Sequence, residues 1–324
     1  MKIKVKAILA GMATYIPGYD YLRATGGTDS ARYCYSVWLR HLVLGHQYLR
    51  QSGMPGIVAE LGPGDSIGIG LAALLSGVEK YFALDIVSYS DLQSNLEILD
   101  ELVLLFSNRA EIPGDDEFPL INPKLQCYDF PHHLLSDESL SIALDPERLA
   151  EIRSSIKHVG DQQSRIQYQA PWADPAVIRP HSVDMIYSQA VLEHVDDLPV
   201  VYEGMQRWLK PNGVMTHQID YKCHGRADAW NGHWTYSDPI WKLVVGRRPY
   251  LLNRMPHSEH MRLMQENGFD IVVEKPIRTA SELRKRQLAA RFRTLSEGDL
   301  TTSGAFVVAM APDDEQSTDA AIGK

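Results

Sequence analysis

The stretch that decides the fold is Ile57-Val58-Ala59-Glu60-Leu61-Gly62-Pro63-Gly64-Asp65-Ser66-Ile67-Gly68, followed by Tyr81-Phe82-Ala83-Leu84-Asp85-Ile86. The first part has the pattern of a buried strand, a glycine turn and the start of a helix, and the second is a strand that ends in an acid. Glycines at 62 and 64 let the backbone approach a ligand, and a helix that begins near Ser66 points its free N–H groups to the same place. The order is that of a nucleotide-binding βαβ unit.

Two details distinguish between nucleotides. A dinucleotide fingerprint has glycine three positions after its second glycine, where this chain has Ile67. Glu60 lies just before the first glycine, and its carboxylate would repel a pyrophosphate but suits a ligand that carries a cationic amino acid. Asp85 is placed to accept hydrogen bonds from two ribose hydroxyls. These features favour S-adenosylmethionine over NAD.

Later blocks of the chain carry a family resemblance. Residues 182–195 read SVDMIYSQAVLEHV and residues 209–214 read LKPNGV. With the glycine turn and Asp85, these blocks resemble the motifs of class I S-adenosylmethionine-dependent methyltransferases, from Ile57 to about Tyr221. The resemblance implies an α/β fold with a Rossmann-like, doubly wound seven-stranded sheet, mostly parallel with a C-terminal antiparallel hairpin, plus inserted cap segments. The residues after the fifth strand are also similar to methyltransferases of bacterial surface-polysaccharide and secondary-metabolite pathways.

The pattern predicts three parts of the chain. We expect an N-terminal helical segment over 1–55, a methyltransferase domain over 56–312 and a disordered tail over 313–324. The domain holds an insertion at about 91–160, because more residues precede the third strand than one crossover helix requires. The insertion is either decoration or a substrate lid. As a lid, residues 101–160 would meet the aromatic-rich segment 224–236 above the cofactor.

Composition excludes several partners. A net charge of −9 argues against a nucleic-acid partner, and Arg284-Lys285-Arg286 is interpreted as the solvated face of a basic helix between the last two strands. The three cysteines lack metal-like spacing, which indicates a reducing cytoplasm. Residues 7–13 are apolar and follow three lysines as in a signal peptide, but they are too short to span a bilayer, so no stable membrane insertion is predicted. A homodimer is left open.

The resemblance implies that the cofactor lies along the glycine turn and the following strand ends. Arg32 and Tyr33 either close over its methionine end or belong to a helix that packs on the sheet. The adenine is expected near residues 169–172. The other expected contacts are Glu60, Gly62, Pro63, Gly64, Ser66, Asp85, Ile86, Ala170, Pro171, Trp172, Ser188 and Gln189.

Methyl transfer to a hydroxyl needs alignment and a base. Asp220 and His224 lie four residues apart, which on a helical turn would let the acid orient the imidazole. We therefore predict His224 as the base and His194 as the next candidate, although the pair can equally be a local salt bridge and His194 structural. His217 lies inside its strand and is expected to be structural.

The acceptor is expected to be a sugar or other small molecule. Trp230, His233 and Trp234 are the predicted substrate contacts, unless the tryptophans only bury apolar area. Arg254 either holds an anionic acceptor or makes a salt bridge at a helix start. Histidines and acids at 217–233 permit a divalent metal, but without a compact ligand triad none is predicted. A cofactor-binding scaffold without activity and an NAD-dependent sugar enzyme are the alternatives.

Overall fold

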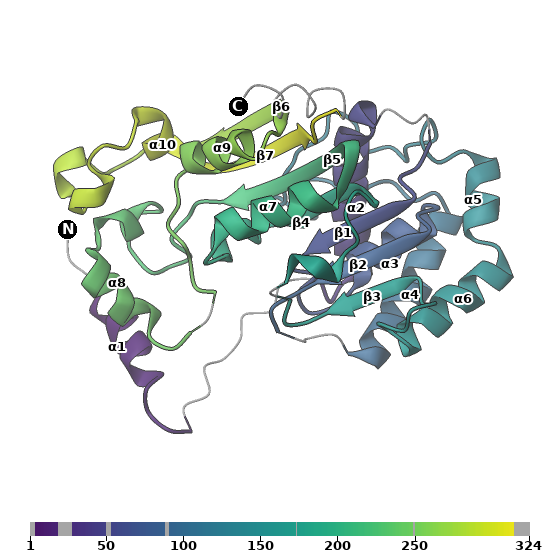
Figure 1. Ribbon diagram of the computed structural model, residues 1–324, viewed down its shortest axis with the longest axis horizontal. Helices are drawn as coiled ribbons and strands as arrows, with labels where there is room; N and C mark the ends of the chain where they lie inside the picture. Colours follow the sequence, from purple (N-terminus) through teal and green to yellow (C-terminus); the bar gives the residue numbers. More distant parts are fainter. Residues whose placement is uncertain are drawn as a thin grey trace, which may run out of the picture.

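The centre of the molecule is a seven-stranded sheet with the order β3-β2-β1-β4-β5-β7-β6 (Figure 1). The computed structural model describes residues 4–18, 28–49, 53–87, 91–172, 174–248 and 250–313. Strand β7 runs antiparallel to both of its neighbours, and the remaining pairs are parallel. The predicted fold is therefore confirmed. The strands are β1 (Ile57–Leu61), β2 (Lys80–Leu84), β3 (Ile166–Gln169), β4 (Val183–Gln189), β5 (Leu209–Asp220), β6 (Asp270–Arg278) and β7 (Thr302–Met310).

Helices cover both faces of the sheet because its central strands are apolar on both sides. Within β1, Val58 packs into one buried cluster and Ala59 into the other. Alternate residues of a strand point to opposite faces, so each strand contributes to both clusters. The first cluster is completed by α2 (Ala31–Gly45), α3 (Gly68–Leu75) and α4 (Leu92–Ser107), and the second by α7 (Leu198–Trp208) and α9 (His257–Glu266).

Helix α2, which lies in the predicted N-terminal helical segment, is buried almost all round. The inserted segment after α4 covers its outer side. Arg40, fully buried, donates hydrogen bonds to the carbonyl oxygens of Pro113 (3.0 Å) and Pro123 (2.8 Å). Tyr35 donates to the carbonyl oxygen of Ala110 at 2.7 Å. The first part of the insertion is therefore a packing layer on α2.

The rest of the insertion forms α5 (Asp137–Ala143) and α6 (Pro146–Lys157). Arg148 of α6 donates to the carbonyl oxygens of Leu74 and Val78, at the end of α3 that is remote from the glycine turn. Figure 1 shows α5 and α6 at the opposite end of the molecule from α1 and α8. The lid prediction is therefore wrong for these two helices, because they are anchored away from segment 224–236.

A small cap combines the start of the described chain with the segment that follows β5. Helix α1 (Val5–Ala13) packs against α8 (Asp238–Val245) so closely that a Cβ on Gly11 would lie 2.0 Å from the carbonyl oxygen of Leu243. The backbone N–H of Lys4 donates to the Tyr236 hydroxyl at 3.2 Å. The shared cluster includes Ala7, Cys223, Ala227, Tyr236, Trp241, Val244 and Leu252. We call α1, α8 and residues 221–256 the cap.

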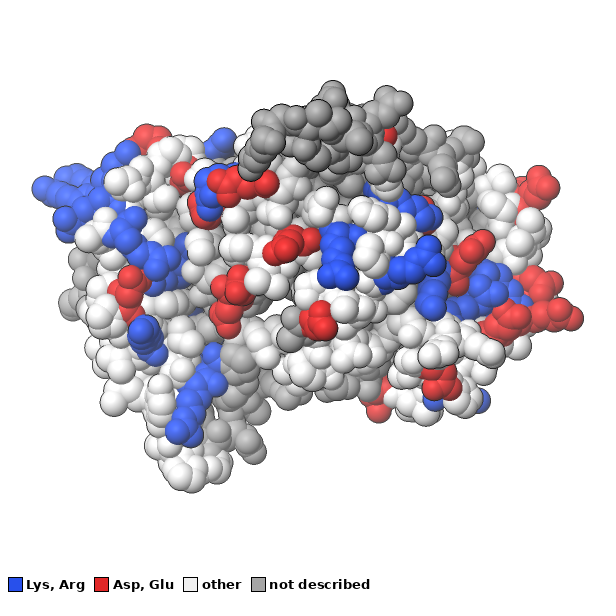
Figure 2. All heavy atoms as spheres, in the orientation of Figure 1, with Lys and Arg blue, Asp and Glu red and all other residues white. Residues whose placement is uncertain are grey.

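The connection between β6 and β7 differs from the expected basic helix. It forms short 3₁₀ turns, η5 (Lys285–Gln287) and η6 (Ala290–Phe292), and then α10 (Glu297–Thr301). The N–H of Ala289 bonds the carbonyl oxygen of Trp234 at 2.9 Å, which ties the chain to the cap instead of to a helical ladder. The basic side chains of this connection are exposed. Figure 2 shows Lys and Arg side chains gathered at the end of the molecule where Figure 1 labels α10.

Two further expectations from the sequence concern membrane insertion and the C-terminal tail. Within the described ranges, every helix is too short or too polar to cross a membrane. The predicted tail lies outside the described residues except for Asp313.

Candidate functional site

The glycine turn after β1 is held in place by protein contacts. Gly62 and Gly64 have φ angles of 66° and 78°, a region that favours glycine. The N–H of Ser66 donates to the Thr28 hydroxyl at 3.1 Å, and the Ser66 hydroxyl bonds the Thr28 carbonyl oxygen. The N–H of Ile67 donates to Asn95 at 3.1 Å. The sequence reasoning missed Thr28 and Asn95, which fix the turn.

Asp85 lies at the end of β2 beside this turn, buried with 5% of its surface exposed. Its carboxylate accepts hydrogen bonds from the backbone N–H groups of Gly64 (3.2 Å) and Ile86 (2.7 Å). Burial raises the pKa of Asp85, and these N–H groups offset part of that rise. The N–H of Trp172 bonds the Asp85 carbonyl oxygen at 3.0 Å, so residues 170–172 lie next to Asp85.

Glu60 occupies a dry position inside the sheet. Its carboxyl accepts hydrogen bonds from the hydroxyls of Tyr81 (2.5 Å) and Tyr187 (3.2 Å), and only 1% of the residue is exposed. Burial raises the pKa of Glu60 to about 8, although both tyrosines lower it. At neutral pH this carboxyl is therefore mostly protonated. A contact between Glu60 and the methionine ammonium stays a prediction.

The start of α2 and the end of β4 meet the insertion. Arg32 forms two hydrogen bonds with Glu117, at 2.7 and 2.5 Å, and the Tyr33 ring packs edge-on against Phe118. The amide of Gln189 donates to the carbonyl oxygen of Asn122 at 3.1 Å. This part of the insertion thus reaches the residues expected at the methionine end. Ser188, another predicted cofactor contact, is buried and bonds His217 Nδ1 at 2.8 Å, so His217 has the expected structural place.

After β4, the 3₁₀ turn η3 (Leu192–His194) is fixed by Asn253. The Asn253 side chain donates to the carbonyl oxygens of Leu192 (2.7 Å) and Val195 (2.9 Å). His194 Nδ1 lies 2.8 Å from the carbonyl oxygen of Tyr250. Because a carbonyl only accepts, Nδ1 carries the proton and Nε2 keeps its lone pair. Burial, followed by nearby His224, lowers the pKa of His194.

Asp220 and His224 come together at the end of β5. His224 Nε2 lies 3.6 Å from Asp220 Oδ2, and the rings of His194 and His224 are 5.2 Å apart between centroids. Residues 221–224 form a bend and a tight turn, so the expected helical turn is wrong, although the two side chains do meet. Burial alone would raise the pKa of Asp220, but His224 and Lys222 bring it below its usual value.

The predicted substrate residues lie mainly inside the cap. Trp234 is fully buried, and its ring N–H donates to the carbonyl oxygen of Arg254 at 2.9 Å. Arg254 is itself buried and pairs with Asp238, the first residue of α8, at 2.6 Å. The sequence left open a salt bridge at the start of the helix after Arg254, whereas the partner in the structure lies at the start of the preceding helix, α8. His233 is buried as well, and burial lowers its pKa to about 3. Trp230, in contrast, is partly exposed.

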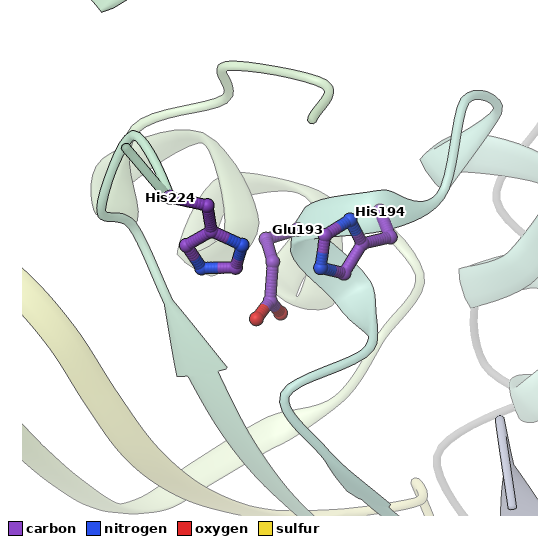
Figure 3. Close-up of side chains that lie close together, drawn as sticks. All are labelled: Glu193, His194 and His224. Carbon is purple, nitrogen blue, oxygen red and sulfur yellow. The ribbon is translucent and has the colours of Figure 1, made fainter. Parts of the chain in front are cut away.

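Several buried polar side-chain atoms in the cap and at or near the ends of β4 and β5 have no hydrogen-bond partner among the described residues. Among the described residues they include both carboxylate oxygens of Glu193, Nδ1 of His233, Nε of Arg254 and Nε2 of His217. Glu193, His194 and His224 each offer a ligand atom, and these three atoms lie within 4.8 Å of one another. Figure 3 shows the three side chains converging from η3 and from the turn after β5. The sequence reasoning missed Glu193, although the LEHV block itself contains it.

Comparison with known proteins adds a family match. A family model described as a methyltransferase domain matches residues 106–274. The match begins after the glycine turn and Asp85, so it is independent of the features that first suggested a nucleotide. No curated protein matches the chain.

Solved structures resemble the chain weakly. A methyltransferase from Mesorhizobium loti is 14% identical, with 84% of this chain and 97% of that chain covered and a TM-score of 0.40. One from Methanosarcina mazei is 12% identical, with 83% and 97% covered and a TM-score of 0.42. A phosphoethanolamine N-methyltransferase from Haemonchus contortus is 14% identical, with 91% and 61% covered and a TM-score of 0.41.

Proposed function

Because the chain belongs to the methyltransferase-domain family, we propose that it methylates a hydroxyl oxygen of a sugar or another small metabolite. The methyl donor is S-adenosylmethionine. The observation that carries the choice of an oxygen acceptor is the meeting of Asp220, His224 and His194 at the ends of β4 and β5. Enzymes that methylate a hydroxyl need a base at this point, and this group supplies one. The surface-polysaccharide and secondary-metabolite pathways suggested by sequence are in keeping with such an acceptor.

The other half of the carboxyl edge of the sheet, at the ends of β1 and β2, suits the methyl donor S-adenosylmethionine. Each Asp85 oxygen is bonded by backbone N–H groups and retains lone pairs for a ribose diol. The glycine turn brings backbone close to the same place, and residues 170–172 are tied to Asp85 and bring Trp172 beside the expected adenine. The predicted contacts of Pro63, Ile86, Ala170 and Pro171 belong to this arrangement. The donor supplies an electrophilic methyl group on a sulfonium.

The chain's own work is to align the acceptor and remove its proton. His224 is one-third exposed and stands at the mouth of the group, where a hydroxyl can reach it. Asp220 stabilises the imidazolium that forms when His224 takes the proton. Trp230 is partly exposed and is the predicted residue best placed to contact an acceptor. An inactive scaffold would leave this pair without a purpose, and Ile67 in place of the third glycine disfavours an NAD-dependent enzyme.

The decisive experiment is a screen by mass spectrometry. The full-length protein is incubated with S-adenosylmethionine and hydroxylated sugars and metabolites, and products are examined for the gain of one methyl group. With the acceptor known, His224→Ala should lower turnover about a hundredfold. His158→Ala, at the exposed end of α6, is the matched control and should leave turnover unchanged.

Cofactor affinity separates the possible outcomes. S-adenosylhomocysteine should bind His224→Ala and the wild type about equally, because His224 does not belong to the donor half. If His224→Ala and Asp220→Asn both retain turnover, the assignment of the base is wrong. Methylation found only on nitrogen or carbon would reject the oxygen acceptor.

A further inference from the structure

Glu193 poses a physical problem that its protein neighbours leave unsolved. The residue is 3% exposed, and neither carboxylate oxygen has a hydrogen-bond partner among the described residues. Burial raises the pKa of Glu193 well above its usual value, and the nearby backbone N–H groups of Glu193 and Asp220, which do not meet hydrogen-bond geometry, offset only part of that rise. The Lys222 ammonium, which acts on Glu193 through its charge, lies 3.2 Å from Asp220 and is engaged there. A buried carboxylate without a partner is costly, so it calls for a cation or a proton.

The two histidines beside Glu193 are prepared as ligands. His194 donates a hydrogen bond from its Nδ1–H to the Tyr250 carbonyl oxygen, which leaves the lone pair of Nε2 free. His224 turns Nε2 toward the Asp220 carboxylate, which leaves Nδ1 free. Metal-binding histidines commonly donate their second nitrogen to a carbonyl or a carboxylate in this way. Figure 3 shows a ring nitrogen of each histidine on the side of the Glu193 carboxylate.

We propose that Glu193, His194 and His224 bind a divalent transition-metal ion of the Zn²⁺ class. Two imidazoles and a carboxylate are a ligand set that such ions prefer. Ligand atoms around a tetrahedral ion lie about 3.4 Å apart, and here they lie within 4.8 Å, so small side-chain movements close the site. Three protein ligands leave a coordination position open, and the exposed edge of His224 gives an ion access.

The ion binds independently of methyl transfer, but it changes how His224 acts if the proposed function holds. As a ligand, His224 no longer accepts a proton. With an ion held by these residues, a hydroxyl at the open position would have a lowered pKa, and its proton would go to bulk water and not to His224. Asp220 becomes the outer partner that orients His224.

The test is metal binding by the full-length protein without cofactor or acceptor. Protein freed of metal with a chelator is titrated with Zn²⁺ in a calorimeter, and Co²⁺ is added separately to record its visible absorption bands. The wild type should bind one ion per chain. Glu193→Gln and His224→Ala should each weaken Zn²⁺ affinity at least about tenfold and change the Co²⁺ bands. His158→Ala is the control, since it removes an exposed histidine far from the site.

The results are read without reference to enzyme activity. His224→Ala changes a partly exposed side chain in a turn, so it keeps the test valid even if Glu193→Gln folds poorly. Absence of stoichiometric binding by the wild type overturns the proposal. So does equal affinity in wild type and His224→Ala. If methylation fails in every screen while metal binding behaves as expected, the metal site stands and the proposed function falls.

Discussion

The two halves of the carboxyl edge of the sheet differ in how their buried polar groups are satisfied. In the cofactor half, at the ends of β1 and β2, Glu60 is bonded by two tyrosines and Asp85 by backbone N–H groups. In the expected acceptor half, Glu193 at the end of β4 and His233 in the cap each keep buried atoms without a partner among the described residues. The buried carboxylates of the expected cofactor half thus have protein partners, whereas the expected acceptor half keeps buried polar atoms that have none there.

This difference indicates where each half gains its specificity. A preorganised set of partners holds one ligand with little rearrangement. Unpartnered groups instead take their final positions from the ligand or the ion that satisfies them. Variants of the two halves should therefore separate cleanly in binding and stability measurements.

The largest expected effect concerns the pH dependence of stability at Glu60. Its pKa is about 8 in the folded protein, against an unfolded value near 4.3, so the folded state holds the proton more tightly. The contribution of Glu60 is therefore full at low pH and is lost as pH rises toward the folded pKa. Glu60→Gln removes this loss. Relative to wild type, the variant should gain about 3 kcal/mol of unfolding free energy between about pH 5 and about pH 8.

Denaturant unfolding of both proteins across that range measures the effect. Other titrating groups, Glu193 included, are present in both proteins and cancel in the difference. A wild type and a variant with parallel pH profiles would show that Glu60 is not satisfied as described, and the comparison between the two halves would fail there.

The next effect is on cofactor affinity. Asp85→Ala should weaken S-adenosylhomocysteine binding about a hundredfold, because two ribose hydroxyls lose a charged acceptor and the glycine turn loses a bond. Asp161→Ala, an exposed acid, should bind as the wild type does. Calorimetry gives the affinities. An unchanged affinity in Asp85→Ala would remove the ribose from this position.

The smallest effect tests whether the cap is energetically separate from the cofactor half. Gly11→Val places atoms against the carbonyl oxygens of Leu243 and Val244, and such overpacking should cost about 2 kcal/mol of stability. S-adenosylhomocysteine affinity should stay within about twofold of wild type. Gly53→Ala is the matched control because no atom lies within 4 Å of the added Cβ. A large loss of affinity in Gly11→Val would show that the cap and the cofactor half are coupled.

The sheet was predictable because its signals are local. Strand β1 is a run of apolar residues that ends in a glycine turn, and Asp85 follows directly after the next such run. The partnership of Asp220 with His224 was also within reach, since only three residues separate them. These features are marked in the local sequence, although distant residues such as Thr28 and Asn95 fix the final geometry of the turn.

The remaining features depend on distant contacts. Glu193 is enclosed because Asn253 and residues around 250 hold η3 from another part of the chain. Helices α5 and α6 lie away from the cap because Arg148 binds carbonyls at the end of α3. The basic segment near Lys285 misses its helix because Leu288 and Phe292 join Trp234 in a separate apolar cluster. The hydrophobic periodicity of a short stretch of sequence does not indicate these long-range contacts.

The pairing of α1 with α8 has a consequence for biosynthesis. Helix α1 leaves the ribosome long before α8, and its apolar Ala7 and Ile8 lack the cluster that they pack against until residues near 245 emerge. The core between them can already assemble, because its parallel strands are joined by shorter connections. Closing the cap is therefore a late, long-range step. Nascent chains halted before α8 should contain a formed glycine turn, whereas their α1 should not yet be packed against the rest of the protein.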